Sequence, residues 1–414
     1  MNTETFPTRI SFEQAGNILA DVAAAVRLPV ERIAPAMAAG RILAEDIDAG
    51  ADFPGFDNSA MDGFALRSFD LEEVAGVHEL ELVGEQFAGL ATGARIGPGQ
   101  CLRVTTGAML PAGADAVVMK ELAQEHAGWV RIKASVAAGQ HVRRQGEDVR
   151  QGERVLRAGD LLTPAGASLA VAVGRSELPV HRRPTVALFT TGDELRAPGM
   201  TLQRGEIHDS NRVLLQGLLL AEGYQPVAWP VLPDDPTRIA TALSDAAEAF
   251  DVVITCGGVS AGEKDHIPAW LASAGKVHFW KVRMRPGMPV LAGQVGACQF
   301  LGLPGNPVSV FATWLTLGRP FLDALQGRRE PRTRWFALLE LPVGKHHDRL
   351  EFLRGRMRCD SSGQLHVSPD PADGSHRLRA AAAANCLLLL PEGTGQWQPG
   401  QVVEVLPLSA MGGE

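Results

Sequence analysis

The chain has 414 residues, more than one hydrophobic core usually supports, so we expect about two to four domains. Apolar residues make up 45% and charged residues 21%, as in an ordinary soluble globular protein. The net charge of -8 and the absence of a lysine- or arginine-rich block exclude a large nucleic-acid or membrane-binding surface, but they remain compatible with a local pocket for an anion.

The N-terminal pattern predicts an amphipathic helix that begins after Ser11, with Gln14 at the second position of a capping box. Residues 51–147 then change to short alternating runs separated by glycine and proline, which indicates a small β domain. Because helical patterning resumes beyond this stretch, we interpret the β domain as an insertion. We assign residues 1–50 together with 148–181 to an N-terminal helical and linker domain.

From residue 182 onward, buried-strand runs alternate with helical segments. Asp235 is expected to cap one of these helices, with Pro236 at the first helical position, where its missing N–H costs nothing. The alternation predicts that residues 182–327 form a three-layer α/β domain whose mainly parallel sheet is covered on both faces. Residues 328–414 return to strand-like runs and predict a separate, barrel-like β module.

The cysteines and the N-terminus bear on the cellular location. The five cysteines form no C-x-x-C pair, which suits a reducing compartment. The first ten residues lack the basic and apolar regions of a secretory signal. The apolar runs are shorter than the roughly 20 residues that a membrane helix needs. We therefore expect a cytoplasmic protein with neither a membrane nor a nucleic acid as partner.

Three strand ends in the α/β domain carry glycine-bearing turns. In an open α/β sheet, ligands bind outside the carboxyl ends of the strands, where glycine lets backbone N–H groups approach an anion. A single glycine pair is more often an ordinary tight turn, whereas three such turns favour a phosphate or similar oxyanion site. The candidate binding residues are Thr191, Gly192, Asp193, Gly257, Gly258, Val259, Ser260, Pro304, Gly305, Asn306 and Pro307.

Three carboxylates, Glu194, Asp234 and Asp265, fall at or just past the predicted strand ends. They would repel a phosphate unless a cation lies between, and Mg²⁺ bridges one or two carboxylates to phosphate oxygens. We therefore predict that these residues bind Mg²⁺. Two alternatives stay open, because Asp234 can help to cap the helix at Pro236 and Glu194 can be a solvated turn residue.

A basic stretch follows, in which Lys281, Arg283 and Arg285 alternate, so we expect them on one face of a strand. Such a row can grip a phosphate or a tetrahedral oxyanion, and the alternative is a solvated edge strand protected by its charges. The sequence has no H-E-x-x-H and no cysteine cluster, which argues against a zinc site, and its residues suggest no Ser-His-Asp arrangement. His346 and His347 are expected in a surface loop.

Seven motifs occur in order along the chain: FDNSAMDGFA (56–65), RVTTGAMLPAGADAVV (103–118), VRRQGEDV (142–149), TTGDEL (190–195), DSNR (209–212), GGVSAGEKDH (257–266) and GLPGNPVS (302–309). Together they resemble the molybdopterin molybdenumtransferases of the bacterial MoeA type, which are related to the gephyrin E domain. GGVS or GLPGNP alone also occurs in other molybdopterin-binding domains, whereas the full series is specific. The resemblance extends over essentially the whole chain.

The resemblance implies a molybdopterin-binding-like α/β domain and an elongated homodimer of four-part subunits. It implies an enzyme that inserts molybdenum from molybdate into the dithiolene of adenylylated molybdopterin, with Mg²⁺-dependent release of AMP. Molybdate and adenylylated molybdopterin would be the substrates, and Mg²⁺ the cofactor. The implied partners are molybdopterin adenylyltransferase and downstream molybdoenzymes or their chaperones.

The resemblance also implies which residues act. The catalytic positions that match in the α/β domain are Glu194, Asp234, Asp265 and Lys281. Further cofactor-binding positions there are Ser210, Asn211 and Arg285. The family builds its cleft from two subunits, so other residues would come from the partner copy. These are the catalytic Asp62, Thr106 and Asp148 and the cofactor-binding Arg143.

One motif departs from the family pattern. Family members often have K-P-G-K-P where this chain has Arg285-Pro-Gly-Met288-Pro, so one positive charge is missing. How tightly this site binds an anion therefore stays open. Two other functions also stay open. A nucleotide pyrophosphatase on the same α/β domain would not need FDNSAMDG or VRRQGED, and a non-catalytic dimeric scaffold would not need the carboxylates and the lysine.

Overall fold

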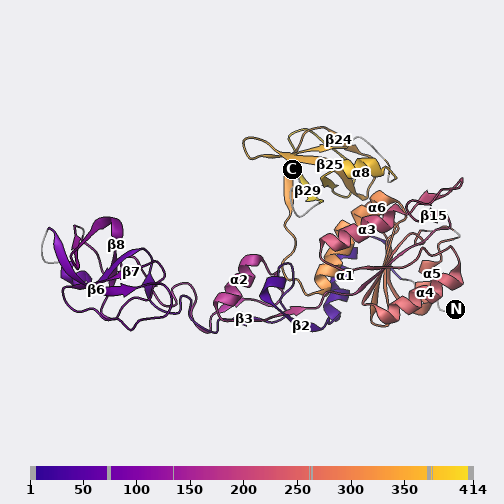
Figure 1. Ribbon diagram of the computed structural model, residues 1–414. Coiled ribbons are helices and arrows are strands. Elements are labelled where there is room, and N and C mark those ends of the chain that lie inside the picture. Colours follow the sequence, from indigo (N-terminus) through magenta and orange to yellow (C-terminus); the bar gives the residue numbers. More distant parts are fainter. Residues whose placement is uncertain are drawn as a thin grey trace.

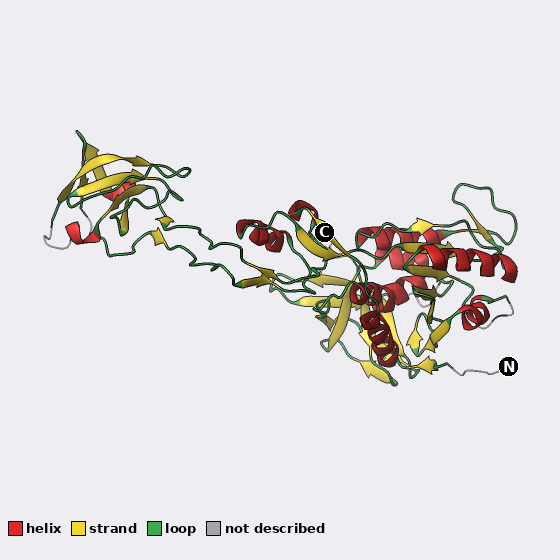
Figure 2. Cartoon of the chain, turned by 90° about the horizontal axis from the view of Figure 1, so that it is seen from below, coloured by secondary structure: helices red, strands yellow, loops and turns green. Residues whose placement is uncertain are grey.

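A computed structural model describes the fold of residues 6–71, 76–133, 135–260, 262, 264–370, 374 and 376–408. The molecule is elongated (Figure 1). The α/β domain lies at one end with the C-terminal β module beside it, and the inserted β domain lies at the other end. The turned view shows the same separation, with two extended segments leading out to the inserted domain (Figure 2).

The α/β domain is built on a seven-stranded sheet in the order β1-β19-β21-β22-β18-β14-β17. Only β21 is antiparallel to its neighbours β19 and β22, and the other pairings are parallel. The strands are β1 (Thr8–Ile10), β14 (Val186–Thr190), β17 (Val227–Ala228), β18 (Val252–Cys256), β19 (Lys276–Val282), β21 (Leu291–Val295) and β22 (Cys298–Leu303). The predicted, mainly parallel sheet is confirmed.

Helices cover both faces of this sheet because its strands are apolar on both sides. In β18, Val252 and Ile254 belong to one core, whereas Val253 faces the other. The first layer consists of α1 (Phe12–Ala25), α3 (Ser210–Ala221) and α6 (Pro307–Thr313), which continues through a π-helical turn (Trp314–Gly318) into α7 (Arg319–Leu325). The second layer consists of α4 (Pro236–Ala249) and α5 (Ile267–Ala274). No helix in the described part of the chain is long and apolar enough to cross a membrane.

The helix starts follow from local sequence. Ser11 and Gln14 form the predicted capping box at α1, in which each side chain accepts a hydrogen bond from the backbone N–H of the other residue. Asp235 caps α4 by accepting a hydrogen bond from the Arg238 N–H, and Pro236 is the first helical residue. Both predicted caps are confirmed.

Residues 6–28 differ from the expected assignment to the N-terminal domain. Strand β1 pairs with β19, with Thr8 opposite Trp280 and Ile10 opposite Val282, and so extends the α/β sheet. Leu19 and Ala23 of α1 are buried in the core of that domain. The physical cause is the long-range burial of one apolar helix face, which local patterning does not reveal.

The remaining N-terminal domain is small and is formed by two stretches of chain. One precedes the inserted domain and the other follows it. Its core includes Leu43, Ile47, Leu162, Ala170 and Leu178. Its elements are β2 (Val30–Ile33), β3 (Ile47–Asp48), β12 (Arg154–Leu156), α2 (Pro164–Ala172) and β13 (Leu178–His181), with β2 paired to β13 and β3 to β12.

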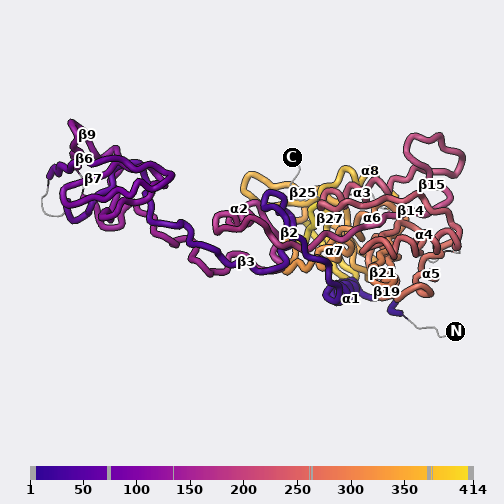
Figure 3. The backbone as a smooth tube through the Cα atoms, turned by 60° about the horizontal axis from the view of Figure 1, so that its bottom comes forward, coloured from indigo at the N-terminus to yellow at the C-terminus, as the bar shows by residue number. Residues whose placement is uncertain are grey.

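The inserted domain contains a six-stranded sheet in the order β8-β5-β7-β6-β10-β9. Its strands are β5 (Gly63–Leu66), β6 (His78–Gln86), β7 (Gln100–Val104), β8 (Ala116–Met119), β9 (Ala123–His126) and β10 (Trp129–Ile132). Two segments, residues 51–59 and 141–151, connect it to the rest of the chain. They pair through β4 (Asn58–Ser59) and β11 (Val142–Arg143). We call these two segments the hinge (Figure 3).

The C-terminal module is a closed barrel, as predicted. Its strands are β23 (Trp335–Leu339), β25 (Leu350–Cys359), β26 (Leu365–Pro369), β27 (Cys386–Leu390) and β29 (Val402–Pro407). Because β25 pairs with both β26 and β27, the sheet closes on itself. A short strand of the α/β domain, β20 (Met284–Arg285), pairs with β25 and ties the two domains together. The module also contains β24 (Val343–Lys345), β28 (Gly395–Trp397) and α8 (Leu378–Ala383).

Candidate functional site

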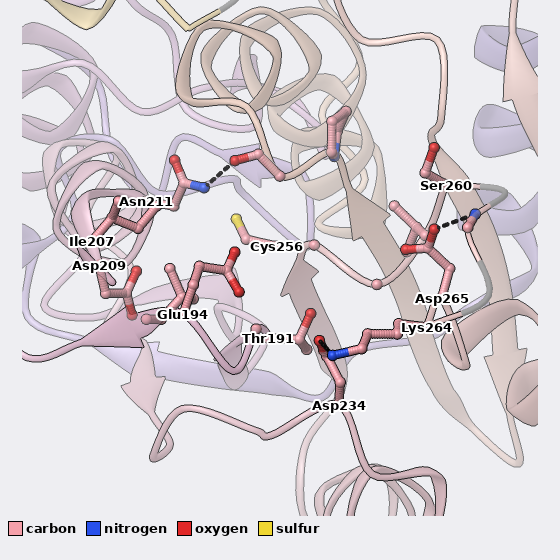
Figure 4. Close-up of a pocket in the computed structure, with 18 of the residues that line it drawn as sticks. Thr191, Glu194, Ile207, Asp209, Asn211, Asp234, Cys256, Ser260, Lys264 and Asp265 are labelled. Carbon is pink, nitrogen blue, oxygen red and sulfur yellow. Dashed lines mark hydrogen bonds and ion pairs between the residues drawn. The ribbon is translucent and has the colours of Figure 1, made fainter. Parts of the chain in front are cut away.

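A cavity of about 550 Å³ opens at the carboxyl ends of β14, β18 and β22, the edge at which the sequence places the ligand (Figure 4). The predicted residues that line it are Thr191, Gly192, Glu194, Ser210, Asn211, Asp234, Gly257, Gly258, Val259, Ser260, Asp265, Pro304, Gly305 and Pro307. The three glycine-bearing turns therefore meet in one place. We call this the sheet-edge cavity.

The turn after β18 requires glycine. Gly257 and Gly258 have φ angles of 90° and 68°, which side-chain-bearing residues rarely adopt. A Cβ atom on Gly257 would lie 2.8 Å from Thr191 Oγ1. The Gly257 N–H donates to the Leu303 carbonyl at 3.1 Å, and the Thr191 N–H donates to the Cys256 carbonyl at 3.0 Å. These bonds hold the three strand ends together around the cavity.

The start of α3 forms another wall. Asp209 caps the helix and is almost fully buried, and it accepts hydrogen bonds from the Thr190 hydroxyl at 2.6 Å and from Arg212 Nε at 3.1 Å. Its carboxylate is thus used within the fold. Asn211 donates from Nδ2 to the Gly305 carbonyl at 2.7 Å, which fixes the turn after β22 against α3.

The three predicted metal-binding carboxylates all line the sheet-edge cavity (Figure 4). Because Asp235 is the cap of α4, the capping alternative for Asp234 is wrong. Burial, and then the neighbouring Asp193 carboxylate, raise the pKa of Asp234. Asp265 accepts a hydrogen bond from the Gly262 N–H at 2.7 Å. Among the described residues, no three acidic, histidine or cysteine side chains form a preorganised metal site.

Two charged side chains lie beside Asp234. Asp193 accepts a hydrogen bond from the Asp234 N–H at 3.1 Å, and Lys264 Nζ lies 3.2 Å from Asp193 Oδ2 and 3.9 Å from Asp234 Oδ2. The Asp234 N–H, and then Lys264, lower the pKa of Asp193. Sequence reasoning missed the position of Lys264, because a lysine in a charged loop gives no signal of which carboxylate it contacts.

A second cavity of about 860 Å³ lies between the α/β domain and the C-terminal module. Pro289 lines both cavities, so they adjoin. The predicted binding residues Arg285 and Asn306 line the second cavity, as does Met288. The C-terminal module adds residues that the sequence did not single out as a site, namely Lys345, His346, His347, Arg349, Glu351 and Arg354. His346 and His347 do lie in a loop, where His346 is exposed and His347 is half-buried, and this loop also lines the second cavity.

The expected basic row does not form. Lys281 has a φ of 69°, which interrupts the alternation, and the next strand begins only at Met284. Lys281 Nζ lies 4.0 Å from the centroid of the Trp280 ring. Arg283 forms an ion pair with Glu392 at 2.6 Å, and Arg285 Nε lies 3.4 Å from the buried carboxylate of Glu351. The three cations thus point to three different environments.

The remaining predicted site residues lie far away, in the inserted domain and the hinge (Figure 1). Asp62 and Thr106 meet there, since Asp62 Oδ1 accepts hydrogen bonds from the Thr106 N–H at 2.8 Å and the Thr106 hydroxyl at 2.9 Å. Arg143 and Asp148 line a third cavity of about 710 Å³ beside the hinge. Within one chain, these residues do not reach the sheet-edge cavity.

Comparisons with known protein families cover most of the chain. Residues 10–174 match the MoeA N-terminal region (domain I and II). Residues 187–324 match a probable molybdopterin binding domain. Residues 337–408 match the MoeA C-terminal region (domain IV).

Relatives match over nearly their full length. A molybdopterin molybdenumtransferase of Haemophilus influenzae is 36% identical over 90% of this chain and 92% of that protein. Molybdopterin molybdenumtransferase 2 of Mycobacterium tuberculosis is 36% identical over 90% and 93%. A crystal structure of the molybdopterin biosynthesis MoeA protein of Pyrococcus horikoshii superposes with a TM-score of 0.82 at 29% identity, covering 96% of this chain and 99% of that chain. The chain therefore belongs to the MoeA family of molybdopterin molybdenumtransferases.

Proposed function

We propose that the chain inserts molybdenum from molybdate into the dithiolene of adenylylated molybdopterin and releases AMP in a Mg²⁺-dependent reaction. The observation that carries this proposal is the sheet-edge cavity, where three glycine-bearing turns meet Glu194, Asp234 and Asp265. Backbone N–H groups at such turns bind phosphate. Carboxylates beside them would repel the phosphate unless a cation lies between. The names of the relatives support the same reaction class.

Mg²⁺ fits this donor set. The charged groups that line the sheet-edge cavity are mostly carboxylates, and burial and neighbouring acids raise the pKa of Asp234, as expected where negative charge is in excess. Mg²⁺ needs only one or two carboxylates when phosphate oxygens and water complete its shell, so a preorganised cage is not required. Glu194, Asp234 and Asp265 would hold it, and there it would neutralise charge on the phosphates.

The chain's own residues would bind and orient the pterin substrate. Ser210, Asn211 and Ser260 bring polar side chains to the sheet-edge cavity, and the turns at Gly192 and Gly257 bring backbone amides. Because Asn211 is already bonded to Gly305, this wall is fixed before substrate arrives. Such preorganisation lowers the cost of positioning the phosphates.

We place molybdate in the second cavity. Molybdate is a tetrahedral dianion, and Arg285, Arg349 and Arg354 line this cavity, whose described lining residues include two carboxylates, Glu351 and Asp370. Guanidinium groups bind oxyanions through paired N–H bonds. The shared wall at Pro289 would keep the oxyanion next to the pterin in the sheet-edge cavity.

We further propose a cytoplasmic homodimer in which a second copy completes the site. Support comes from the distance of Asp62, Thr106, Arg143 and Asp148 from the sheet-edge cavity of their own chain (Figure 1). All four side chains are exposed at the far end of the molecule or in the hinge. In the described part of the chain, the five cysteines are free thiols, which supports a reducing location.

The direct test supplies purified protein with adenylylated molybdopterin, molybdate and Mg²⁺ and measures AMP by chromatography. We expect AMP release that stops when molybdate is omitted or when a chelator removes the metal. Release of AMP without molybdate would indicate a pyrophosphatase. A folded protein that releases no AMP under any of these conditions would instead support the scaffold function.

A further inference from the structure

Lys264 is placed between acidic groups at the sheet-edge cavity. Its Nζ lies 3.2 Å from Asp193 Oδ2 and 3.9 Å from Asp234 Oδ2. The Lys264 side chain is 70% exposed, whereas that of Asp234 is only 15% exposed. The ammonium group therefore reaches from solvent to a largely covered carboxylate (Figure 4).

Asp234 lies among other acidic groups. Its N–H donates to the Asp193 carboxylate at 3.1 Å, and the Glu194 side chain lines the same cavity. Lys264 is also the only lysine or arginine among the described residues that line the sheet-edge cavity. In the metal-free protein, this one side chain supplies the compensating charge.

We propose that Lys264 is a resident counter-ion that competes with the divalent cation for Asp234. The ammonium group lies beside Asp193 and Asp234 in the free protein and must leave Asp234 when the cation binds, because two cations beside one carboxylate repel each other. Its exposed side chain can leave at little cost, since exposed ion pairs contribute weakly. This inference rests on the proposed function, because it assumes that a divalent cation binds at Asp234.

The test titrates the full-length protein with Mn²⁺, a spectroscopic substitute for Mg²⁺, and follows free Mn²⁺ by electron paramagnetic resonance. We expect Lys264→Met to bind Mn²⁺ about 2- to 5-fold more tightly than the wild type at low salt, with a smaller difference at high salt. Lys264→Arg keeps the charge and should behave like the wild type. Lys276→Met, at the opposite edge of the same sheet, is the matched control and should leave the affinity unchanged.

The outcomes separate the inference from the proposed metal site. Unchanged or weaker Mn²⁺ binding in Lys264→Met would overturn the competition. An equal gain in Lys276→Met would also overturn it, because the effect would then be one of overall charge. Asp234→Asn tests the site itself. If the wild type binds no Mn²⁺, or if Asp234→Asn binds it as well as the wild type does, the metal site fails and the inference fails with it.

Discussion

At the residue scale, Asp62 is a predicted site residue whose replacement should affect activity without affecting stability. Hydrogen bonds from the Thr106 N–H and then from its hydroxyl lower the pKa of Asp62, so its carboxylate is charged at neutral pH. We expect Asp62→Ala to reduce AMP release by at least about 100-fold, as loss of a transition-state contact does, with the melting temperature within about 1 °C of wild type. Asp62→Asn is the control for charge, because its carbonyl still accepts both bonds. Full activity in Asp62→Asn would show that the negative charge is not used.

Met288 allows a test in the opposite direction, by gain of function. It lines the second cavity together with Arg285, at a position where many family members carry lysine. We expect Met288→Lys to bind molybdate about 2- to 10-fold more tightly at low salt, measured by isothermal titration calorimetry, because the added ammonium attracts the dianion. Val402→Lys, at an exposed position of β29 in the C-terminal module, adds an equal charge elsewhere and should have no effect. Equal affinities of Met288→Lys and the wild type would place molybdate outside this cavity.

At the element scale, two carboxylates connect the two segments of the hinge through hydrogen bonds. Asp57 accepts hydrogen bonds from the Gln145 N–H at 2.8 Å and from Arg144 at 2.7 Å, and Asp52 accepts from the Gln151 N–H at 2.8 Å. Because the backbone bonds favour the charged forms, the pKa of each carboxyl group is lowered. The stabilisation is therefore present above the ordinary carboxyl pKa and is lost as the pH falls through the lowered values.

Amide hydrogen exchange can check this connection. We expect protection at Gln145 and Gln151 to fall as both carboxylates become protonated, after correction for the intrinsic exchange rate. At neutral pH, Asp57→Ala should expose the Gln145 amide and leave Gln151 protected, because Asp52 is untouched. Equal protection of Gln145 in the variant and the wild type would show that the β4–β11 pairing alone holds the hinge.

Local chemistry explains which elements the sequence could predict. The caps at Ser11 and Asp235 depend on residues three positions away, so the helix starts could be found. The glycine-bearing turns were likewise found at the correct strand ends. The place of β1 in the sheet depends on pairing with Trp280, more than 250 residues away in the chain, and no local pattern encodes it.

The sequence likewise predicted some residues of the candidate site and missed others. Carboxylates at strand ends could be predicted, because the sheet edge is where ligands bind in such folds. The basic row at Lys281 could not, since one left-handed φ angle redirects the following side chains. The contribution of Glu351 and His347 also stayed hidden, because these residues reach the second cavity only after the barrel packs against the α/β domain.

At the scale of the whole molecule, the elongated shape makes the shared site testable. In our proposal, Asp265 acts in the sheet-edge cavity of one subunit and Asp62 reaches it from the partner. Each substitution, Asp62→Ala or Asp265→Ala, should then inactivate a homodimer. A mixed dimer would still hold one cavity with both residues intact.

Mixing equal amounts of the two inactive variants should therefore restore about one quarter of wild-type activity, because half of the dimers are mixed and each has one complete site. Native mass spectrometry of differently tagged chains would establish that the subunits have exchanged. The matched control mixes Asp62→Ala with the double variant, which cannot form a complete site and should stay inactive. If exchange is complete and no activity returns, Asp62 and Asp265 do not act across the dimer, and the inserted domain must serve another purpose.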